Sequence, residues 1–179
     1  VPNWLVPAPS VVVGELVSSS AELVPHILAT IKLSLLGLLI GGMLGFVLGN
    51  VLHIWPAAYQ IVYPFMLISQ NIPTIVLAPI LIIWFGFGIL PKLVIISLVC
   101  FFPIALALLD GLRQTAPELK HYFQMAGATK WQQFWQLELP SAMPALFSGI
   151  KIATTYSVMG AVITEWLGAK EGIGVFMTY

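Results

Sequence analysis

The sequence is dominated by long hydrophobic segments and contains only one long polar stretch. Between Leu33 and Pro91 the chain carries no Asp, Glu, Lys or Arg. A continuous helix over this segment would be about 88 Å long, whereas the hydrocarbon core of a bilayer is about 30 Å thick. The segment must therefore cross a membrane more than once. Clusters of glycine, asparagine and proline predict breaks at 49–56 and 86–91.

These breaks predict four membrane spans, at about 27–52, 57–85, 92–112 and 145–166. The second span contains three prolines and would measure about 43 Å as a straight helix, which is too long for one upright helix and too short for two. We therefore expect a tilted, kinked helix there, or a span with a protruding stub. Prolines are tolerated in such a span where neighbouring helices or a cavity satisfy the freed carbonyl groups.

The first span carries glycines at every fourth position, namely Gly37, Gly41, Gly45 and Gly49. On a helix these positions form one smooth ridge, where the backbone of another helix can approach closely. The spacing predicts tight helix packing in a bundle and does not by itself indicate what the bundle does.

Composition agrees with a membrane protein. Of the 179 residues, 59% are hydrophobic and only 8% are charged, against about 25% charged residues in soluble domains. We predict an all-α polytopic membrane bundle, a single domain over residues 1–179 that is truncated at both ends. The net charge of zero means that the chain has no excess of basic residues of the kind that binds nucleic acid. The single cysteine cannot form an intrachain disulfide, and the three histidines lack metal-ligand spacing.

The polar stretch at 113–142 is predicted to form a pair of short helices. Thr115 and Glu118 have the spacing of a capping box, with Pro117 in the first turn. Gly127 should interrupt this first helix, and Thr129 can cap a second one. Leu139-Pro140 should end the second helix, because proline cannot continue the hydrogen-bond ladder. Three basic residues in this stretch place the loop on the cytoplasmic side.

The second loop helix carries an aromatic stripe, because Trp131, Phe134 and Trp135 are spaced i, i+3 and i+4. Exposed aromatics of this kind must be buried against something. The stripe can lie on lipid headgroups, fold back onto its own bundle, or dock into a soluble partner. The residues alone do not decide among these three.

Few polar residues lie within the spans. Gln70-Asn71 is an uncharged pair just before Pro73 and is a candidate for the lining of a solute pathway. Glu165 is the acidic residue closest to the end of the last span, where it can serve transport or gating, or simply reach headgroups or water.

The run Gly127-Ala128-Thr129-Lys130-Trp131, followed by Phe134 and Leu139-Pro140, resembles the cytoplasmic EAA loop of ABC importer permeases, including the thirteen-residue spacing from Gly127 to Pro140. Ile72-Pro73 to Ala78-Pro79, Ile83 to Gly86 and Leu90-Pro91-Lys92 resemble the signature of the nitrate, sulfonate and taurine permeases. Further matches are Pro7 to Val11, Phe101 to Pro103, Glu165 to Gly168 and Gly172 to Gly174. The amino-acid sequences at 109–111 and 155–161 resemble those of the branch that imports thiamine-precursor pyrimidines.

The resemblance implies the type I permease core, with a coupling helix that sits in a groove of an ATPase subunit. Trp131 and Phe134 would be its anchors and Lys130 a charge at the rim. It also implies a permease homodimer, two ATPase subunits that use ATP, an extracytoplasmic solute-binding protein and a place in the bacterial inner membrane. One departure is that His121-Tyr122-Phe123 replaces the Glu-Ala-Ala that names the loop, so the role of that glutamate is not carried over.

The chain has no phosphate-binding loop of the Gly-x-x-x-x-Gly-Lys-Ser/Thr type, so we expect a transport subunit and not an enzyme, without a cofactor or metal of its own. The solute would be a small polar molecule, either a pyrimidine or a compound resembling sulfonate, taurine or nitrate. The alternative is a self-contained secondary transporter or channel. Such proteins usually carry charged or proton-relay residues inside their spans, and the first three predicted spans are almost bare of them.

Overall fold

The computed structural model describes residues 8, 10–11, 14 and 18–178, apart from the side chains of Thr74 and Ile75. Two residues of the Pro7 to Val11 segment of the family resemblance, Pro7 and Pro9, lie outside these described residues. Residues 18–178 form helices and contain no strand. The helices are α2 (Ser20–Ile54), α3 (Pro56–Ser69), α4 (Thr74–Phe85), α5 (Ile89–Arg113), α6 (Pro117–Met125), α7 (Lys130–Gln133), the π-helix η1 (Phe134–Glu138), α8 (Leu139–Glu165) and α9 (Ile173–Phe176).

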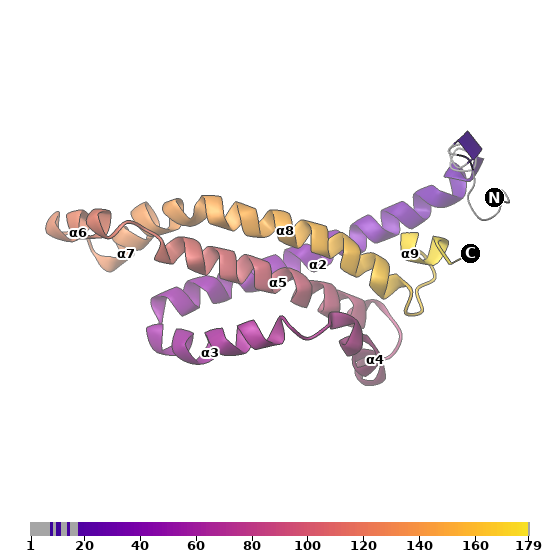
Figure 1. Ribbon diagram of the computed structural model, residues 1–179, viewed down its shortest axis with the longest axis horizontal. Coiled ribbons are helices and arrows are strands. Elements are labelled where there is room, and N and C mark those ends of the chain that lie inside the picture. The colour runs from indigo at the N-terminus through magenta and orange to yellow at the C-terminus, as the bar shows by residue number, and fades with distance from the viewer. Residues whose placement is uncertain (1–7, 9, 12–13, 15–17, 179) are drawn as a thin grey trace.

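Helix α5 is the centre of the bundle and packs against both α2 and α8 (Figure 1). Helices α6 and α7 project at one end, which we call the loop end, while α9 and the start of α2 lie at the opposite end. Three continuous helical segments are long and apolar enough to span a membrane: α2, α5 and the run from Lys130 to Glu165. The predicted all-α polytopic bundle is confirmed.

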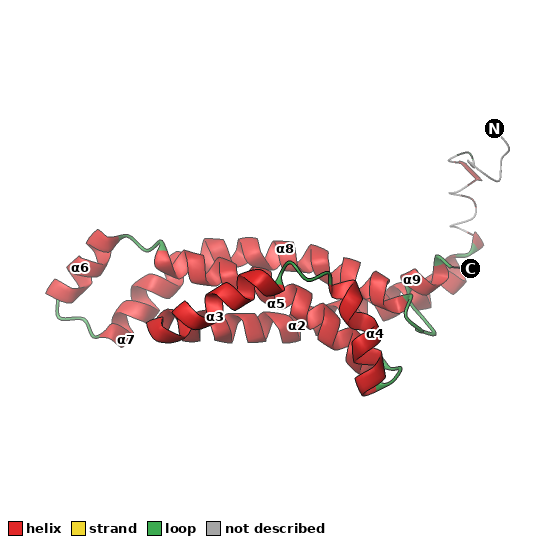
Figure 2. Ribbon diagram, turned by 60° about the horizontal axis from the view of Figure 1, so that its bottom comes forward, coloured by secondary structure: helices red, strands yellow, loops and turns green. Residues whose placement is uncertain are grey.

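The second predicted span is a broken helix. Helix α3 ends at Ser69 and α4 begins at Thr74, with an irregular connection between them (Figure 2). Pro73 explains the break, because it lacks an amide N–H and disfavours helical geometry at the residue before it. At about 21 and 18 Å, neither helix spans a membrane alone. The chain nevertheless passes from the loop end to the opposite end through both, which keeps four crossings.

The glycine ridge of α2 packs directly on α5. All four glycines are buried. A Cβ atom added to Gly41 would overlap the Ser97 carbonyl, and one added to Gly45 would lie 2.7 Å from the Phe101 carbonyl oxygen. The predicted close approach of two backbones is therefore confirmed, and α5 is the partner.

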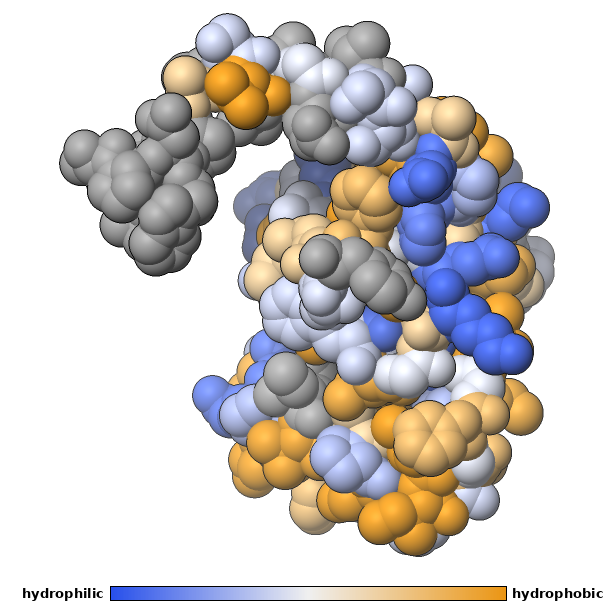
Figure 3. Space-filling model, turned by 90° about the vertical axis from the view of Figure 1, so that its right-hand side faces the viewer, coloured by the Kyte–Doolittle hydropathy of each residue, from blue (hydrophilic) through white to orange (hydrophobic). Residues whose placement is uncertain are grey.

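The outer surface of the bundle is largely apolar. Residues such as Leu39, Met43 and Ile83 are 60–80% exposed, which is expected where the surrounding solvent is lipid. The end opposite the loop combines hydrophilic and hydrophobic surface (Figure 3), as expected for a region that meets both headgroups and water.

Candidate functional site

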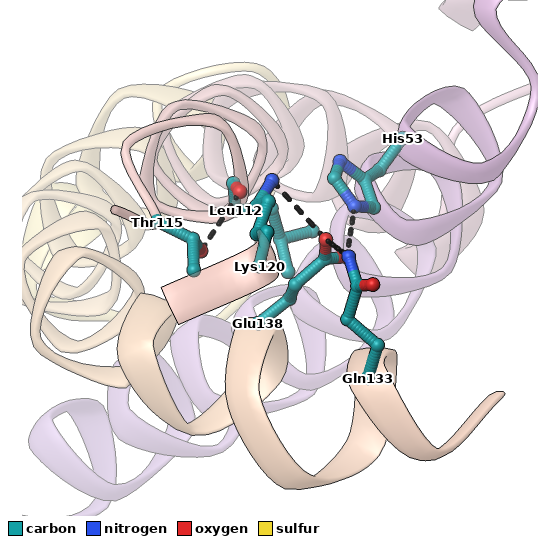
Figure 4. Close-up of polar contacts among 6 residues, drawn as sticks. All are labelled: His53, Leu112, Thr115, Lys120, Gln133 and Glu138. Carbon is teal, nitrogen blue, oxygen red and sulfur yellow. Dashed lines mark hydrogen bonds and ion pairs between the residues drawn. The ribbon is translucent and has the colours of Figure 1, made fainter. Parts of the chain in front are cut away.

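The loop at 113–142 begins with a helix that differs in one detail from the prediction. Helix α6 has Pro117 in its first turn, as expected, but its N-cap residue is Ala116. The Thr115 hydroxyl instead donates to the Leu112 carbonyl at 3.0 Å and is buried (Figure 4). The predicted capping box of Thr115 and Glu118 is therefore wrong. Thr115 is drawn back onto the end of α5, and the fixed φ angle of Pro117 starts the helix.

The turn between α6 and α7 follows the prediction closely. Gly127 has a φ angle of +78°, a left-handed conformation that costs other residues about 1–2 kcal/mol. The Thr129 hydroxyl accepts the Gln132 amide N–H at 3.2 Å, and the Gln132 side-chain oxygen accepts the Thr129 amide N–H at 2.8 Å. This reciprocal capping box fixes the direction in which α7 leaves the turn.

Leu139-Pro140 does not end the second loop helix, contrary to the prediction. Helix α7 continues through η1 into α8, giving one helical run from Lys130 to Glu165. In the π-helical register the Leu139 amide N–H bonds to the Phe134 carbonyl, five residues back. A proline in an α-helix would clash with the carbonyl four residues back. The wider register at η1 accommodates Pro140, which lies in the first turn of α8.

The loop helices expose a large apolar surface. Helix α6 has no buried residue. Five large hydrophobic residues of the loop are exposed, with these exposed fractions: Leu119 (48%), Tyr122 (64%), Met125 (81%), Trp131 (66%) and Trp135 (48%). The Trp131 and Trp135 rings meet edge to face with centroids 5.4 Å apart. We call these five residues the loop surface. Because Tyr122 belongs to it, the departure from Glu-Ala-Ala lies on this exposed face.

Phe134 does not share the exposure of the two tryptophans. It is only 8% exposed and belongs to the main core cluster. Its ring lies 6.2 Å from the His53 ring and 5.5 Å from that of Trp135. The expected exposure of Phe134 is wrong, because this side chain, in the π-helical turn, packs into the core. It supports the tryptophans from beneath.

A buried glutamate ties the loop to the bundle. Glu138 is 7% exposed and its carboxylate has three partners from different segments (Figure 4). His53 Nε2 at the end of α2 lies 2.7 Å from Glu138 Oε2. Lys120 Nζ from α6 lies 3.1 Å, and Gln133 Nε2 from α7 lies 2.9 Å, from Glu138 Oε1. We call these four residues the Glu138 cluster. A buried carboxylate is stable only with such compensation, so the cluster holds α2, α6 and α7 together.

Sequence reasoning missed this cluster. His53 lies in the predicted break at 49–56, and no local pattern in the sequence relates it to Glu138. The two residues are 85 positions apart, and the spacing of five between Gln133 and Glu138 does not place them on one face of an α-helix. One local signal is the acidic residue directly before Leu139-Pro140, where the chain enters the last predicted span.

The polar candidates within the spans occupy two different places. Gln70 and Asn71 lie at the break between α3 and α4, where the Asn71 amide donates to the Leu67 carbonyl at 2.9 Å. Glu165 lies at the end opposite the loop and is only 2% exposed. Its carboxylate accepts the Thr30 hydroxyl at 2.7 Å and the Gly174 amide N–H at 2.8 Å. Glu165 therefore does not reach headgroups or water, but joins α2, α8 and α9.

Comparison with known proteins connects these features to a transport family. Residues 37–179 match the family model described as the binding-protein-dependent transport system inner membrane component. The chain is 38% identical over 174 residues to the formylaminopyrimidine transport permease protein of Halalkalibacterium halodurans, which covers 97% of this chain and 70% of that protein.

Two more distant relatives are permeases for other solutes. The riboflavin transport system permease protein of Chloroflexus aurantiacus is 31% identical over 98% of this chain and 66% of its own length. The taurine transport system permease protein of Escherichia coli is 27% identical over 86% of this chain and 56% of its own length.

Proposed function

This chain belongs to the family of inner membrane components of binding-protein-dependent transport systems, and from that premise we propose how its loop and its pathway work. It is a multi-pass membrane protein and the permease subunit of an ABC importer for a small solute. The family uses ATP through a separate ATPase subunit and receives solute from a binding protein. The alternative of a self-contained secondary transporter gains no support from the relatives.

We propose that residues 113–142 form the cytoplasmic coupling loop within a single permease domain. The loop surface would sit in a groove of the ATPase subunit, with Trp131 as the main anchor and Lys130 at the rim. Central aromatic residues of this kind commonly dominate binding free energy at interfaces. The exposure of Trp131 and Trp135 supports docking over the option that the stripe folds back onto its own bundle. The capping box that fixes the start of α7 supports a fitted protein socket over lipid headgroups.

The observation that carries the proposal is the continuity of the helix that bears Trp131. This residue is 66% exposed, one position after the start of a 36-residue helical run that ends at Glu165. Such a run is about 54 Å long. A displacement at the ATPase surface would therefore be transmitted into α8 along a continuous helical backbone that includes the π-helical turn, and through the Glu138 cluster into α2.

Each remaining loop residue has a physical task in this proposal. Gly127 supplies the left-handed turn, Ala128 follows it, and Thr129 caps α7. Phe134 supports Trp131 from the core. Leu139-Pro140 joins the loop to α8 through the π-helical turn.

We propose a homodimer of this chain with two ATPase subunits and an extracytoplasmic solute-binding protein. ATP would close the ATPase dimer and draw the two coupling loops together. The spans would tilt and open a central cavity outward, and hydrolysis would reset it. The solute would be a pyrimidine or a compound resembling sulfonate, taurine or nitrate. Gln70 remains a candidate for the pathway, whereas the engaged side chains of Asn71 and Glu165 favour structural roles.

Reconstitution into vesicles tests this function. The full-length permease is incorporated with its ATPase subunit, and the binding protein and a radiolabelled solute are added outside. We expect uptake only when ATP, the ATPase and the binding protein are all present. Uptake driven by an ion gradient in vesicles that lack the ATPase would instead establish the secondary transporter.

A further inference from the structure

A cavity of about 350 Å³ lies beside the break in the second span. Its walls come from the α3–α4 connection, from α5 and from α8. The lining residues are Ser69, Gln70, Ile72, Pro73, Val99, Phe102, Pro103 and Tyr156. The volume falls within the range of sites for small molecules.

The cavity lies at mid-depth in the bundle. Val99 and Pro103 are near the middle of α5, which runs from Ile89 to Arg113. Tyr156 lies on α8 between the Glu138 cluster at the loop end and buried Glu165 at the opposite end. Irregular backbone at membrane depth is tolerated only where protein surrounds it or where it lines a water-filled cavity. The break at Gln70 to Pro73 therefore fits a cavity that holds solute or water.

Two polar side chains at the cavity have no protein partner among the described residues. The Ser69 hydroxyl is engaged, since it donates to the Met66 carbonyl at 2.9 Å. In contrast, neither the Gln70 amide nor the Tyr156 hydroxyl forms a hydrogen bond within the described part of the chain. Both side chains are exposed on the surface of this chain, Tyr156 by 44%, and polar groups that face apolar surroundings without a partner are costly. Both groups border the same cavity, so a ligand in it can satisfy both.

A backbone acceptor accompanies these side chains. Pro103 has no amide N–H to donate to the carbonyl of Val99 four residues earlier, and both residues line the cavity. The Val99 carbonyl therefore lacks its usual helical donor, and the lining residues also include the amide of Gln70 and the phenol of Tyr156. The aromatic faces of Phe102 and Tyr156 stand among them, and Phe102 is fixed edge to face against Phe101 at 5.0 Å.

The charge of the residues that line the cavity distinguishes between the two proposed classes of solute, pyrimidines and anions. No lysine, arginine or histidine is among the lining residues that the structure describes. The basic side chains Lys92 and Lys170 line a different cavity at the end opposite the loop. The start of α4 contributes a partial positive charge of only about one half, which is too little to compensate a full anion at mid-membrane. A flat ring with hydrogen-bonding edges suits the aromatic walls better.

We infer that this cavity is the solute site of the permease and that it takes an uncharged, planar heterocycle with donor and acceptor groups on its edge, in preference to a sulfonate or nitrate anion. The inference rests on the proposed transport function. Gln70 would bond to the edge of the ring, while Phe102 and Tyr156 would contact its faces.

Uptake by the complete reconstituted transporter tests the inference, with a formylaminopyrimidine as the neutral probe and taurine as the charged probe. The wild type should take up the pyrimidine and not taurine. Gln70→Leu should raise the KM for the pyrimidine about tenfold, since one hydrogen bond to the ring is lost. Asn71→Leu is the matched control and should leave KM unchanged, because its amide bonds to Leu67 and it does not line the cavity.

The outcomes separate this inference from the transport function. Preference for taurine, uptake of neither probe, or an unchanged KM in both Gln70→Leu and Tyr156→Phe would overturn the inferred site, even if hydrolysis still responds to the binding protein. Loss of ATP-dependent function in the wild type would overturn the proposed function itself. Stimulated hydrolysis in every variant serves as the check that each complex is folded.

Discussion

His53 at the end of α2 and Glu138 in η1 are joined by a contact of 2.7 Å between Nε2 and Oε2. The two residues are separated by 85 positions, and the contact closes the loop end of the bundle. It connects the first helix of the described bundle to the segment that carries the loop surface. With Lys120 and Gln133 on the other carboxylate oxygen, Glu138 sets where α6 and α7 lie relative to the membrane helices.

Neutralising Glu138 should therefore weaken coupling without preventing membrane insertion. In Glu138→Gln the ion pair with Lys120 is lost and the hydrogen bonds to this buried side chain lose the strength that its charge gives them, which costs about 1–3 kcal/mol. We expect the solute imported per ATP hydrolysed to fall several-fold, measured as uptake and phosphate release in the same vesicles.

Glu118→Gln is the matched control. Glu118 is an exposed acid in the first turn of α6 with no ion pair among the described residues. Its variant should transport normally. Equal transport ratios in the two variants would show that the Glu138 cluster does not carry coupling.

The turn at Gly127 gives a graded test of loop geometry. No atom lies within 4 Å of a Cβ added there, so the constraint comes from the φ angle of +78° and not from space. Asn tolerates this conformation far better than a β-branched residue. Gly127→Asn should keep most ATP-coupled uptake, and Gly127→Val should lose most of it. An equal loss in both variants would point to a steric requirement instead.

The glycine ridge predicts that the same substitution at two adjacent glycines of α2, Gly41 and Gly42, has different effects on stability. Gly41→Ala would press a methyl group onto the Ser97 carbonyl, whereas Gly42→Ala meets only the end of the Ile104 side chain at 3.4 Å. Overpacking of this kind costs about 1–3 kcal/mol. Thermal unfolding in detergent should show a lower Tm for Gly41→Ala and little change for Gly42→Ala. Matching Tm values would mean that α2 and α5 can separate freely.

Glu165 should behave as a structural residue. In Glu165→Gln the side-chain oxygen can still accept the Gly174 amide N–H, and the NH₂ group can donate to the Thr30 hydroxyl oxygen if that hydroxyl turns its proton to the His26 carbonyl. Both buried hydrogen bonds then lose the strength that the carboxylate charge gives them. We expect a lower Tm with the KM for solute unchanged. Exposed Glu171 supplies the control, and Glu171→Gln should leave both values as they were. If Glu165→Gln changed the KM for solute while its Tm stayed normal, Glu165 would instead be a residue of the solute pathway.

Local features of this chain were predictable from sequence, whereas long-range polar contacts were not. Hydrophobic length gave the four crossings, and the short-range chemistry of Gly127 and Thr129 gave the turn and the cap of α7. The glycine spacing in α2 also predicted its packed face. Each of these depends on residues within a few positions of one another.

Three differences around η1 share one cause, a change of helical register, whereas the Thr115 capping box and the burial of Glu165 have other causes. The π-helical turn at η1 accommodates Pro140, turns Phe134 into the core and brings Gln133 to Glu138. An α-helical pattern predicts none of these. The burial of Glu165 depends on residues of α2 and α9, which no local pattern relates to it.

The most direct test of the account is co-purification of the ATPase subunit with this permease, because the loop surface is proposed to be its docking site. The full-length permease is tagged, expressed with its ATPase and solubilised in mild detergent, as wild type, Trp131→Phe and Trp131→Asp. We expect the ATPase to be retained by wild type and Trp131→Phe and lost with Trp131→Asp, at equal amounts of membrane-inserted permease. Full retention of the ATPase by Trp131→Asp would contradict the docking role of the loop.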